Sequence, residues 1–254
     1  MTRLLVFPHS HFCEKARWAL DHHGVAHTPV AILPGVHMIT VRRYGPGTSV
    51  PVLIDGGNAI QGSDRILDHL ERQHPGTPLL PEAPEARAQC LALEREMERD
   101  LGVTLRSILY HRLLAYPDFI RYCFTYPLPR ARQLAFTLMY PALRRKIHEV
   151  YVGSDAAVAA ARERFDAAMT RLSARVGESP YLVGDRFSRA DLSVAAMLSL
   201  LVMPPEHPMP WPQIPDPEIR ALVDAYAGHP VCAWVREQYR THRHRAPAAA
   251  ARPA

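Results

Sequence analysis

Hydrophobic positions in the first third of the chain alternate between short continuous runs and helically spaced sets. Four apolar runs predict strands at residues 4–7, 30–33, 50–54 and 58–60. The turn at residues 55–57 joins the last two runs into a hairpin. Apolar residues three and four apart predict helices over residues 12–23 and after Ser63, which is expected to cap its helix. The order β-α-β followed by β-β-α predicts a small α/β domain.

A proline-rich segment at residues 74–81 breaks both patterns and predicts a domain boundary. Beyond it the spacing predicts helices at residues 84–115, 130–150, 155–176, 190–203, 217–227 and 231–239. Pro141 predicts a break or kink inside one of these helices. Seven prolines between Pro204 and Pro217 predict an extended crossing or a loop.

These patterns predict a two-domain chain. We expect an α/β domain at residues 1–78, an all-helical domain at residues 84–245 and a disordered, low-complexity tail at residues 246–254. We expect a ligand site in the cleft between the two domains, where small-molecule pockets often lie.

Composition supports a globular protein, with 48% hydrophobic and 22% charged residues. No apolar run reaches the ~18 residues that a membrane helix needs, and the N-terminus lacks the features of a signal peptide. We therefore predict a cytoplasmic protein without a membrane partner. The widely scattered cysteines favour reduced thiols over a disulfide framework: Cys13, Cys90, Cys123 and Cys232.

The net charge is +5, from 30 Lys and Arg against 25 Asp and Glu, and much of the excess lies in two clusters. Residues 144–146 form one and arginines between residues 240 and 245 form the other, and we interpret both as solvated basic patches. A nucleic-acid partner would require basic residues interleaved with exposed aromatics or a reader motif, and neither is evident, so we predict none. The histidines are numerous, but their spacing does not make a convergent ligand set, so we predict no metal site.

The segment at residues 7–15 predicts a strand, a turn and a helix, and is the most informative in the chain. Ser10 stands just before the helix and Cys13 stands in its first turn. The free N–H groups and the positive end of the helix dipole favour an anion there, and a hydroxyl can donate a hydrogen bond to a bound thiolate. On residue type alone, Ser10 is equally well interpreted as a helix cap.

Two further segments have the same ambiguity. Pro51 opens a predicted strand, although proline cannot donate to a central ladder, and a cis Val50–Pro51 bond would leave the preceding backbone free to pair with a ligand. Residues 61–64 place a hydroxyl and backbone N–H groups at the start of a helix, which suits a carboxylate or serves as a plain cap.

Together these segments resemble the cytosolic glutathione transferases over about residues 4–240. Four motifs carry the resemblance: Ser10-x-x-Cys13 at the catalytic Ser, Tyr or Cys position, Val50-Pro51 in the cis-proline strand, Ser63-x-x-Ile66 in the third segment, and residues 181–192 as the folding motif. In the last motif Ser188 and Asp191 would form a capping box and have a structural role.

The resemblance implies a thioredoxin-like domain followed by the family's helical bundle. It also implies a homodimer and a serine-type N-terminal motif, similar to bacterial members of the family. Ser10 would be catalytic, stabilising the thiolate of the co-substrate glutathione for attack on a small hydrophobic electrophile. The implied glutathione-binding residues are Ser10, Phe12, Val50, Pro51, Gln61, Gly62, Ser63 and Asp64. The implied hydrophobic substrate pocket consists of His11, Tyr110, Leu113 and Leu114.

The sequence also departs from the family pattern. Gly62 stands where the family usually has Glu or Gln, which leaves recognition of the γ-glutamyl amine to Gln61 or Asp64. Cys13 occupies the second cysteine position of redox-active relatives, as an inert buried thiol or as a redox group. The alternatives are a glutathione-dependent isomerase, dehalogenase, ether-cleaving enzyme or thiol–disulfide reductase, and a non-catalytic binding protein of the same fold.

Overall fold

The computed structural model describes residues 2–244, so the tail predicted at residues 246–254 lies outside the described residues. One four-stranded sheet has the order β2-β1-β3-β4, with β1 and β2 parallel and the other pairs antiparallel. Its strands are β1 (Arg3–Val6), β2 (Thr28–Ala31), β3 (Val52–Asp55) and β4 (Asn58–Gln61). The predicted β-α-β and β-β-α order is confirmed, and the arrangement is thioredoxin-like.

Alternation along the strands divides the apolar side chains between the two faces of the sheet. Leu4 and Leu53 are paired across β1 and β3 and join the main core beneath α1 (His11–His22) and α3 (Ser63–Gln73). Leu5 and its partner Val52 lie on the opposite face, in a smaller cluster that Val41 covers. Both faces are therefore buried, which explains the continuous apolar runs.

Val41 belongs to a short helix, α2 (His37–Val41), that the sequence pattern does not predict. Five residues are too few to show helical periodicity. Burial of Val41 on the sheet holds this helix in place. The predicted strand at residues 50–54 is also shifted, since β3 begins at Val52 and Pro51 precedes the ladder.

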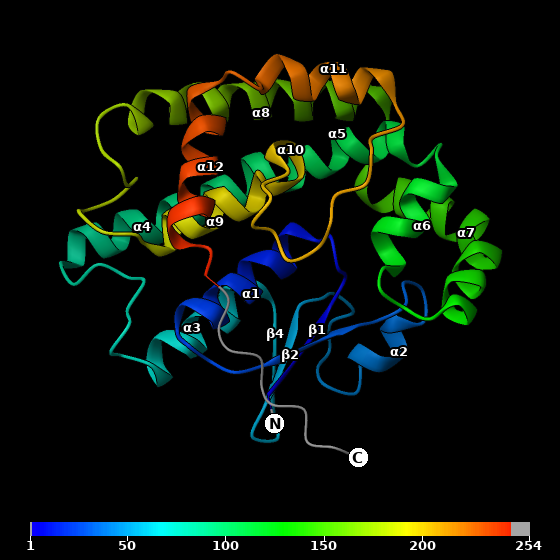
Figure 1. Cartoon of the computed structure of the whole chain (residues 1–254), viewed down its shortest axis with the longest axis horizontal. Coiled ribbons are helices and arrows are strands. Elements are labelled where there is room, and N and C mark those ends of the chain that lie inside the picture. The colour runs from blue at the N-terminus through cyan, green and yellow to red at the C-terminus, as the bar shows by residue number, and fades with distance from the viewer. Residues whose placement is uncertain (1, 245–254) are drawn as a thin grey trace.

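Every regular element between residues 84 and 242 is a helix (Figure 1). The helices are α4 (Pro84–Met97), the π-helix η1 (Glu98–Val103), α5 (Thr104–Leu113), α6 (Pro117–Thr125), α7 (Arg130–Tyr151), α8 (Asp155–Val176), α9 (Arg189–Met197), α10 (Ser199–Val202), α11 (Pro217–Tyr226) and α12 (Pro230–His242). The prediction at residues 155–176 matches α8, and the proline-rich residues 204–216 form an extended crossing between α10 and α11, as predicted.

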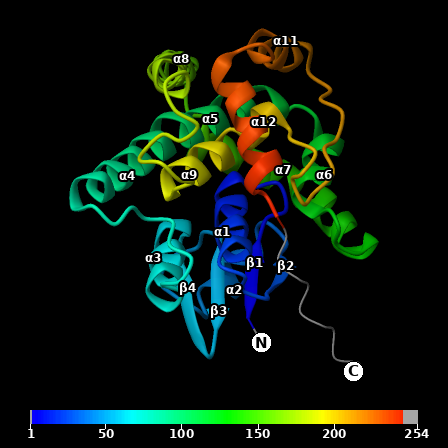
Figure 2. The same cartoon turned by 60° about the vertical axis from the view of Figure 1, so that its left-hand side comes forward.

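Helix α1 links the sheet to the helical part of the molecule (Figure 2). It packs against α3 on one side and α9 on the other. Its Trp18 side chain is fully buried, with its ring 4.5 Å from Tyr239 and 5.6 Å from Phe187, measured between centroids. One continuous hydrophobic core therefore extends from the sheet into the helices, and the N-terminus of α1 lies where the two parts meet.

Three helix boundaries differ from the predictions. The segment predicted at residues 84–115 is interrupted by η1, where Gly102 lies against the Met197 and His11 side chains. The segment predicted at residues 190–203 is split into α9 and α10 and ends at Met203, which has a left-handed backbone conformation. Pro141 does not break α7, which continues to Tyr151.

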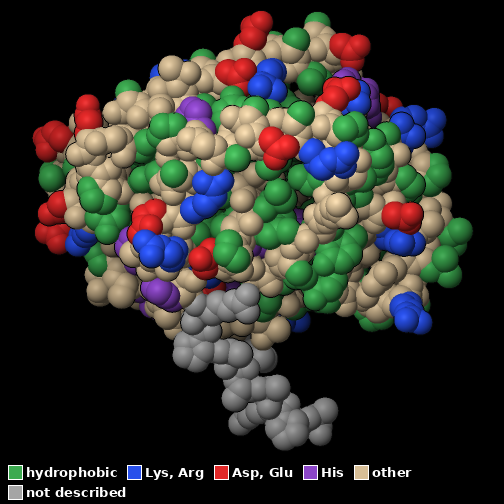
Figure 3. Space-filling model, turned by 45° about the horizontal axis from the view of Figure 1, so that its top comes forward, with side chains coloured by type: hydrophobic (Ala, Val, Ile, Leu, Met, Phe, Trp, Pro, Cys, Tyr) green, Lys and Arg blue, Asp and Glu red, His purple; other side chains and the backbone are tan. Residues whose placement is uncertain are grey.

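On the face that Figure 3 shows, acidic and basic side chains are interspersed with apolar ones. Among residues 2–244, no helix combines the length and the apolar character that crossing a membrane would require.

Candidate functional site

Ser10 occupies the turn between β1 and α1, where its N–H donates to the Phe7 carbonyl at 3.1 Å. It is the N-cap of α1, and its hydroxyl oxygen accepts a hydrogen bond from the Cys13 N–H at 3.4 Å. The side chain is half-buried and lines a cleft. The cap uses only an acceptor site of the oxygen, so capping α1 does not prevent the hydroxyl from also facing a ligand in the cleft.

Cys13 lies one helical turn further on, with no exposed surface. Burial raises the pKa of the Cys13 thiol above its ordinary value, although Ser10 partly opposes this shift. Since the reactive form of cysteine is the thiolate, this environment favours the inert interpretation. All four cysteines of the chain are free thiols in the structure.

The Val50–Pro51 peptide bond is cis, and Val50 lines the same cleft as Ser10. The ladder of β3 begins at Val52, which pairs with Gln61. The Pro51 carbonyl accepts the Gly62 N–H at 3.0 Å, so the start of α3 is joined to this turn. Val50 itself lies outside the ladder and borders the cleft.

The start of α3 differs from the prediction. Gly62 is the N-cap of α3, and Ser63 is the buried first helical residue, so Ser63 does not cap the helix. Gly62 has a φ of 101°, a conformation that favours glycine, and a Cβ there would lie 2.7 Å from an Asp64 carboxylate oxygen. A Glu or Gln would therefore strain this backbone, which gives a physical reason for glycine.

The Gln61 side chain is hydrogen-bonded to the neighbouring loop at residues 47–49. Its side-chain oxygen accepts the Gly47 N–H at 3.1 Å, and its side-chain nitrogen donates to the Ser49 carbonyl at 2.8 Å. Of the two candidates for amine recognition, the exposed Asp64 carboxylate in the first turn of α3 is therefore the one that is open to solvent.

The cleft that Ser10 and Val50 border has a volume of about 410 Å³ and lies between the sheet and the helical part of the chain. The predicted residues Phe12, His11, Tyr110 and Leu113 also line it. Leu114 lies outside the lining, because its side chain is buried in the core and its carbonyl accepts the Tyr140 hydroxyl at 2.7 Å. Further apolar wall comes from Leu109, Phe119, Ile120, Phe124, Ile147 and Tyr151.

His9 borders the cleft and was not predicted to do so. Its Nδ1 lies 3.0 Å from the Cys123 carbonyl of α6, and its Nε2 lies 3.0 Å from the Pro210 carbonyl of the proline-rich crossing. Burial lowers the pKa of His9, although both carbonyl contacts favour the charged ring. Trp211, which lines the cleft, lies 5.6 Å from the His9 ring between centroids. The proline-rich crossing is therefore one wall of the site.

His11 and Arg106 are adjacent polar residues in the cleft wall. Burial, with a further contribution from the Arg106 charge, lowers the pKa of His11 to about 3, so its ring is neutral at physiological pH. Arg106 was missed, although an arginine among the apolar residues at the start of α5 was a signal for it.

Ser188 and Asp191 form the predicted capping box at the start of α9. The buried Asp191 carboxylate accepts the Ser188 N–H at 2.8 Å and the Ser188 hydroxyl at 2.6 Å. Its other oxygen accepts the Leu182 N–H at 2.7 Å. Neither residue borders the cleft, which fits the structural role predicted for them.

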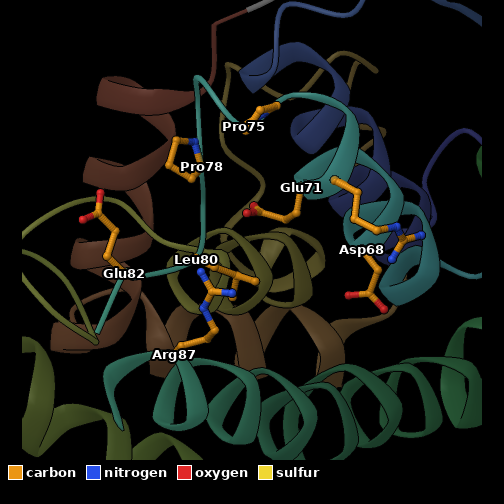
Figure 4. Close-up of a pocket in the computed structure, with 8 residues that line it drawn as sticks. Asp68, Glu71, Pro75, Pro78, Leu80, Glu82 and Arg87 are labelled. Carbon is orange, nitrogen blue, oxygen red and sulfur yellow. The ribbon is translucent and has the colours of Figure 1, made fainter. Parts of the chain in front are cut away.

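A second hollow, of about 400 Å³, lies where α3, the interdomain linker and α4 meet. Figure 4 shows Glu71 and Asp68 on one side of it and Arg87 on the other. These acidic groups already have protein partners, since Glu71 accepts the Leu79 N–H at 2.8 Å and Asp68 pairs with Arg189 at 2.5 Å. We interpret this hollow as a structural contact between the two parts of the chain and not as a ligand site. Within residues 2–244 no three His, Cys, Asp or Glu side chains are grouped as metal ligands.

Comparisons with protein families agree with this geometry. Residues 4–78 match the N-terminal domain of glutathione S-transferase, and residues 155–225 match the C-terminal domain of glutathione S-transferase. The chain therefore belongs to the glutathione S-transferase superfamily.

The chain is 26% identical to glutathione S-transferase F14 of Arabidopsis thaliana over 194 residues, which cover 76% of this chain and 59% of that relative. A solved glutathione S-transferase from Methylobacillus flagellatus with glutathione bound has a TM-score of 0.64 at 16% identity, covering 96% of this chain and 97% of the other.

Two more solved structures share the fold. A glutathione S-transferase from Methylobacterium radiotolerans, in complex with glutathione sulfonate, has a TM-score of 0.63 at 20% identity, covering 100% of this chain and 99% of the other. The β-etherase LigF from Sphingobium has a TM-score of 0.62 at 18% identity, covering 93% of this chain and 99% of the other. At this level of identity the structural matches show the fold alone.

Proposed function

We propose that this protein is a serine-type glutathione transferase that activates the glutathione thiol for attack on a hydrophobic electrophile. The observation that carries the proposal is the position of Ser10, whose hydroxyl caps α1 and borders a cleft that is otherwise mostly apolar. A thiolate beside it would lie near both a hydroxyl donor and the positive end of a helix.

The energetic requirement is modest. An unperturbed thiol has a pKa of about 8.5, and lowering it by about two units requires about 2.7 kcal/mol of preferential thiolate stabilisation. One charge-assisted hydrogen bond contributes about 1.5–3 kcal/mol, and a helix N-terminus about 0.3–1 kcal/mol. Ser10 and α1 together are therefore sufficient to ionise a bound thiol near neutral pH.

Glutathione would lie along the first domain, which we place at residues 1–78. Its sulfur would face Ser10 and Phe12, its backbone would pair with Val50 beside Pro51, and its γ-glutamyl group would meet the start of α3. There Ser63 and the backbone N–H groups after Gly62 would bind the γ-glutamyl carboxylate, and Asp64 would bind the γ-glutamyl amine. Gln61 would support this site indirectly, because its side chain is hydrogen-bonded to the neighbouring loop. These groups supply donors to an anion and an acceptor to a cation.

The electrophile would occupy the apolar part of the cleft, in a helical domain that we place at residues 84–245. His11, Tyr110 and Leu113 would contact it. In a substitution reaction the thiolate sulfur forms a bond to the electrophilic carbon, and the leaving group departs with the electron pair of the broken bond. We further propose a cytoplasmic homodimer without a membrane or nucleic-acid partner.

Among the alternatives, thiol–disulfide reduction is disfavoured by the burial of Cys13 and the raised pKa of its thiol. Isomerisation, dehalogenation and ether cleavage use the same thiolate and differ in the electrophile. A non-catalytic binding protein would keep the cleft and lack turnover.

Glutathione binding and turnover separate these possibilities. We expect the protein to be retained on immobilised glutathione, to be released by free glutathione, and to conjugate at least one of a panel of aryl halides, benzyl halides, epoxides and enones. Retention without turnover of any of these would favour the binding protein. Lack of retention, together with no heat of glutathione binding in calorimetry, would refute the proposal.

A further inference from the structure

Arg106 of α5 lines the cleft, and no acidic side chain within residues 2–244 pairs with it. Its guanidinium carbon lies 4.3 Å from the centre of the Tyr151 ring and 5.7 Å from that of Phe12. These aromatic contacts hold the group in place but use none of its five N–H donors. Its Nε is buried and has no hydrogen-bond partner among the described residues.

The fully buried arginines of the chain are different, because each pairs with a carboxylate. These pairs are Arg17 with Glu14 at 3.1 Å, Arg189 with Asp68 at 2.5 Å, and Arg243 with Glu14 at 2.7 Å. Arg106 is only half-buried as a whole, but its Nε is shielded from water and has no partner among the described residues. A ligand carboxylate that enters the cleft can supply the acceptor that this group lacks there.

The surroundings of Arg106 favour an anion. Among residues 2–244 the cleft lining contains no Asp or Glu side chain, and its other permanent cation, Lys146, already donates to Glu149 at 3.2 Å. Beside Arg106, the buried His11 ring is neutral and hydrogen-bonds the Gly102 backbone. Arg106 is therefore the unpaired permanent cation among the described residues of a mostly apolar lining.

We infer that the electrophile carries a carboxylate beside its apolar body, and that Arg106 is the residue that selects it. This inference rests on the proposed function and names its substrate class. A carboxylate matches the planar fork of a guanidinium in a bidentate pair, and a single negative charge matches the single unpaired cation.

Two other roles for Arg106 make different predictions. As a structural element it would only stack on Tyr151, and a flexible apolar residue would replace it without changing ligand choice. As a glutathione contact it would bind a carboxylate of glutathione itself. This role is conceivable on distance, because Arg106 stacks on Phe12, which follows the proposed thiolate-binding Ser10 by only two residues. The experiment must therefore vary the electrophile part of the ligand while keeping glutathione constant.

Calorimetric titration with S-benzylglutathione and its ortho, meta and para carboxybenzyl analogues provides this comparison at neutral pH. The three isomers place the same carboxylate at different distances from the sulfur. We expect at least one isomer to bind the wild-type protein about tenfold tighter than S-benzylglutathione, since each 1.4 kcal/mol is tenfold in affinity. Arg106→Met should abolish this preference and leave the affinity for S-benzylglutathione within about twofold, and Arg106→Lys should keep part of it.

Arg145→Met is the matched control, because Arg145 is an exposed arginine of α7 outside the cleft lining. It should leave the carboxylate preference unchanged. The inference is overturned if no isomer binds tighter than S-benzylglutathione, if the preference survives in Arg106→Met, or if Arg145→Met removes it equally. Equal weakening of all four conjugates by Arg106→Met would assign Arg106 to glutathione instead and would also overturn it.

A glutathione-free pair separates this inference from the proposed function. We expect 3-phenylpropionate to bind the wild-type protein more tightly than 3-phenylpropan-1-ol, and Arg106→Met to remove the difference. If glutathione and its conjugates fail to bind while this difference is present and depends on Arg106, the proposed function is wrong and the carboxylate site stands. If the acid and the alcohol bind equally, the carboxylate site is wrong.

Discussion

Ser10 and Cys13 are three residues apart in one helical turn, yet their environments are opposite. Ser10 is half-buried and borders the cleft, whereas Cys13 has no exposed surface and packs in the main core. The Ser-x-x-Cys spacing predicted both residues at the helix start, and the family resemblance assigned the ligand to Ser10. The burial of Cys13 supports that assignment, and burial depends on the sheet and on α9 as much as on the turn itself.

Ser10→Ala should therefore impair glutathione activation. Losing the hydroxyl should raise the pKa of the bound thiol by about one to two units and cut conjugation by roughly 10- to 100-fold, since each unit is about 1.4 kcal/mol. Ser10→Cys should shift activity toward mixed disulfides, because an accessible thiol there can attack glutathione disulfide. Both effects are read from pH–rate profiles with one model electrophile.

Cys13→Ala is the control for this prediction. It should leave the pH–rate profile unchanged and lower stability only through lost packing. A Cys13→Ala protein without activity, beside a Ser10→Ala protein of nearly normal activity, would mean that the thiolate role belongs to Cys13.

Asp191 accepts more hydrogen bonds than its sequence motif predicts. Ser188-x-x-Asp191 predicted the capping box, but the hydrogen bond from the Leu182 N–H depends on a loop that returns to the helix start. Asp191→Ala would leave buried donors without an acceptor, so we expect a loss of about 2–3 kcal/mol in the free energy of unfolding. Turnover per folded molecule should be unchanged.

Denaturant unfolding of Asp191→Ala beside Ser154→Ala measures this cost. Ser154 caps the exposed start of α8, where its hydroxyl oxygen accepts the Ala157 N–H at 3.2 Å, so its loss should cost about 0.5–1 kcal/mol. Equal losses in the two variants would show that the buried Leu182 bond contributes nothing.

At the scale of elements, periodicity predicted the long regular segments and failed at the short or irregular ones. Helix α8 shows a clear apolar stripe, whereas the five residues of α2 are held by Val41 on the sheet. The π-helical turn η1 also keeps the helical spacing nearly intact, so no pattern reveals it. The proline-rich crossing was predicted to be extended or a loop, but its position over the cleft requires tertiary contacts that lie far away in sequence.

His9 provides one such contact, since it lies between α6 and the carbonyl of Pro210 in the crossing. Replacing it with alanine should free the crossing from the turn before α1 without removing the prolines. In His9→Ala we expect faster hydrogen–deuterium exchange of the amides at residues 206–214. Exchange in α8, which does not contact His9, should be unchanged and serves as the internal control. Unaltered exchange in the crossing would show that its prolines and Trp211 hold it without His9.

At the scale of the whole molecule, two buried ionic clusters join the sheet part to the helical part. Lys15 of α1 pairs with Glu94 of α4, and Glu94 also pairs with Arg189 at 2.6 Å. Glu14 pairs with Arg17 and with Arg243, and His207 of the crossing lies 3.7 Å away. The sequence predicted each helix but none of these pairs, because a charge inside an amphipathic helix is expected to face solvent until its partner is known.

The contribution of the Glu14 cluster to stability can be tested through its dependence on pH. Burial alone would raise the pKa of Glu14, but the nearby Arg243, His207 and Arg17 outweigh it and lower the pKa to about 2. An unfolded Glu has a pKa of about 4.3, so Glu14 contributes stability above that value, and the contribution is lost as the pH falls toward 2.

Glu14→Gln leaves two buried guanidinium groups short of a carboxylate, so we expect it to lower the free energy of unfolding by about 3–5 kcal/mol near neutral pH. The difference from the wild-type protein should shrink as the pH falls from about 4 toward 2, because the unfolded wild-type carboxyl is then protonated while the folded one keeps its charge until the pH reaches about 2. Glu237→Gln, which breaks the exposed pair with Arg240, is the control and should leave stability nearly unchanged. A Glu14→Gln deficit that is the same at pH 7 and at pH 3 would show that the lost contribution is packing or hydrogen bonding and not charge.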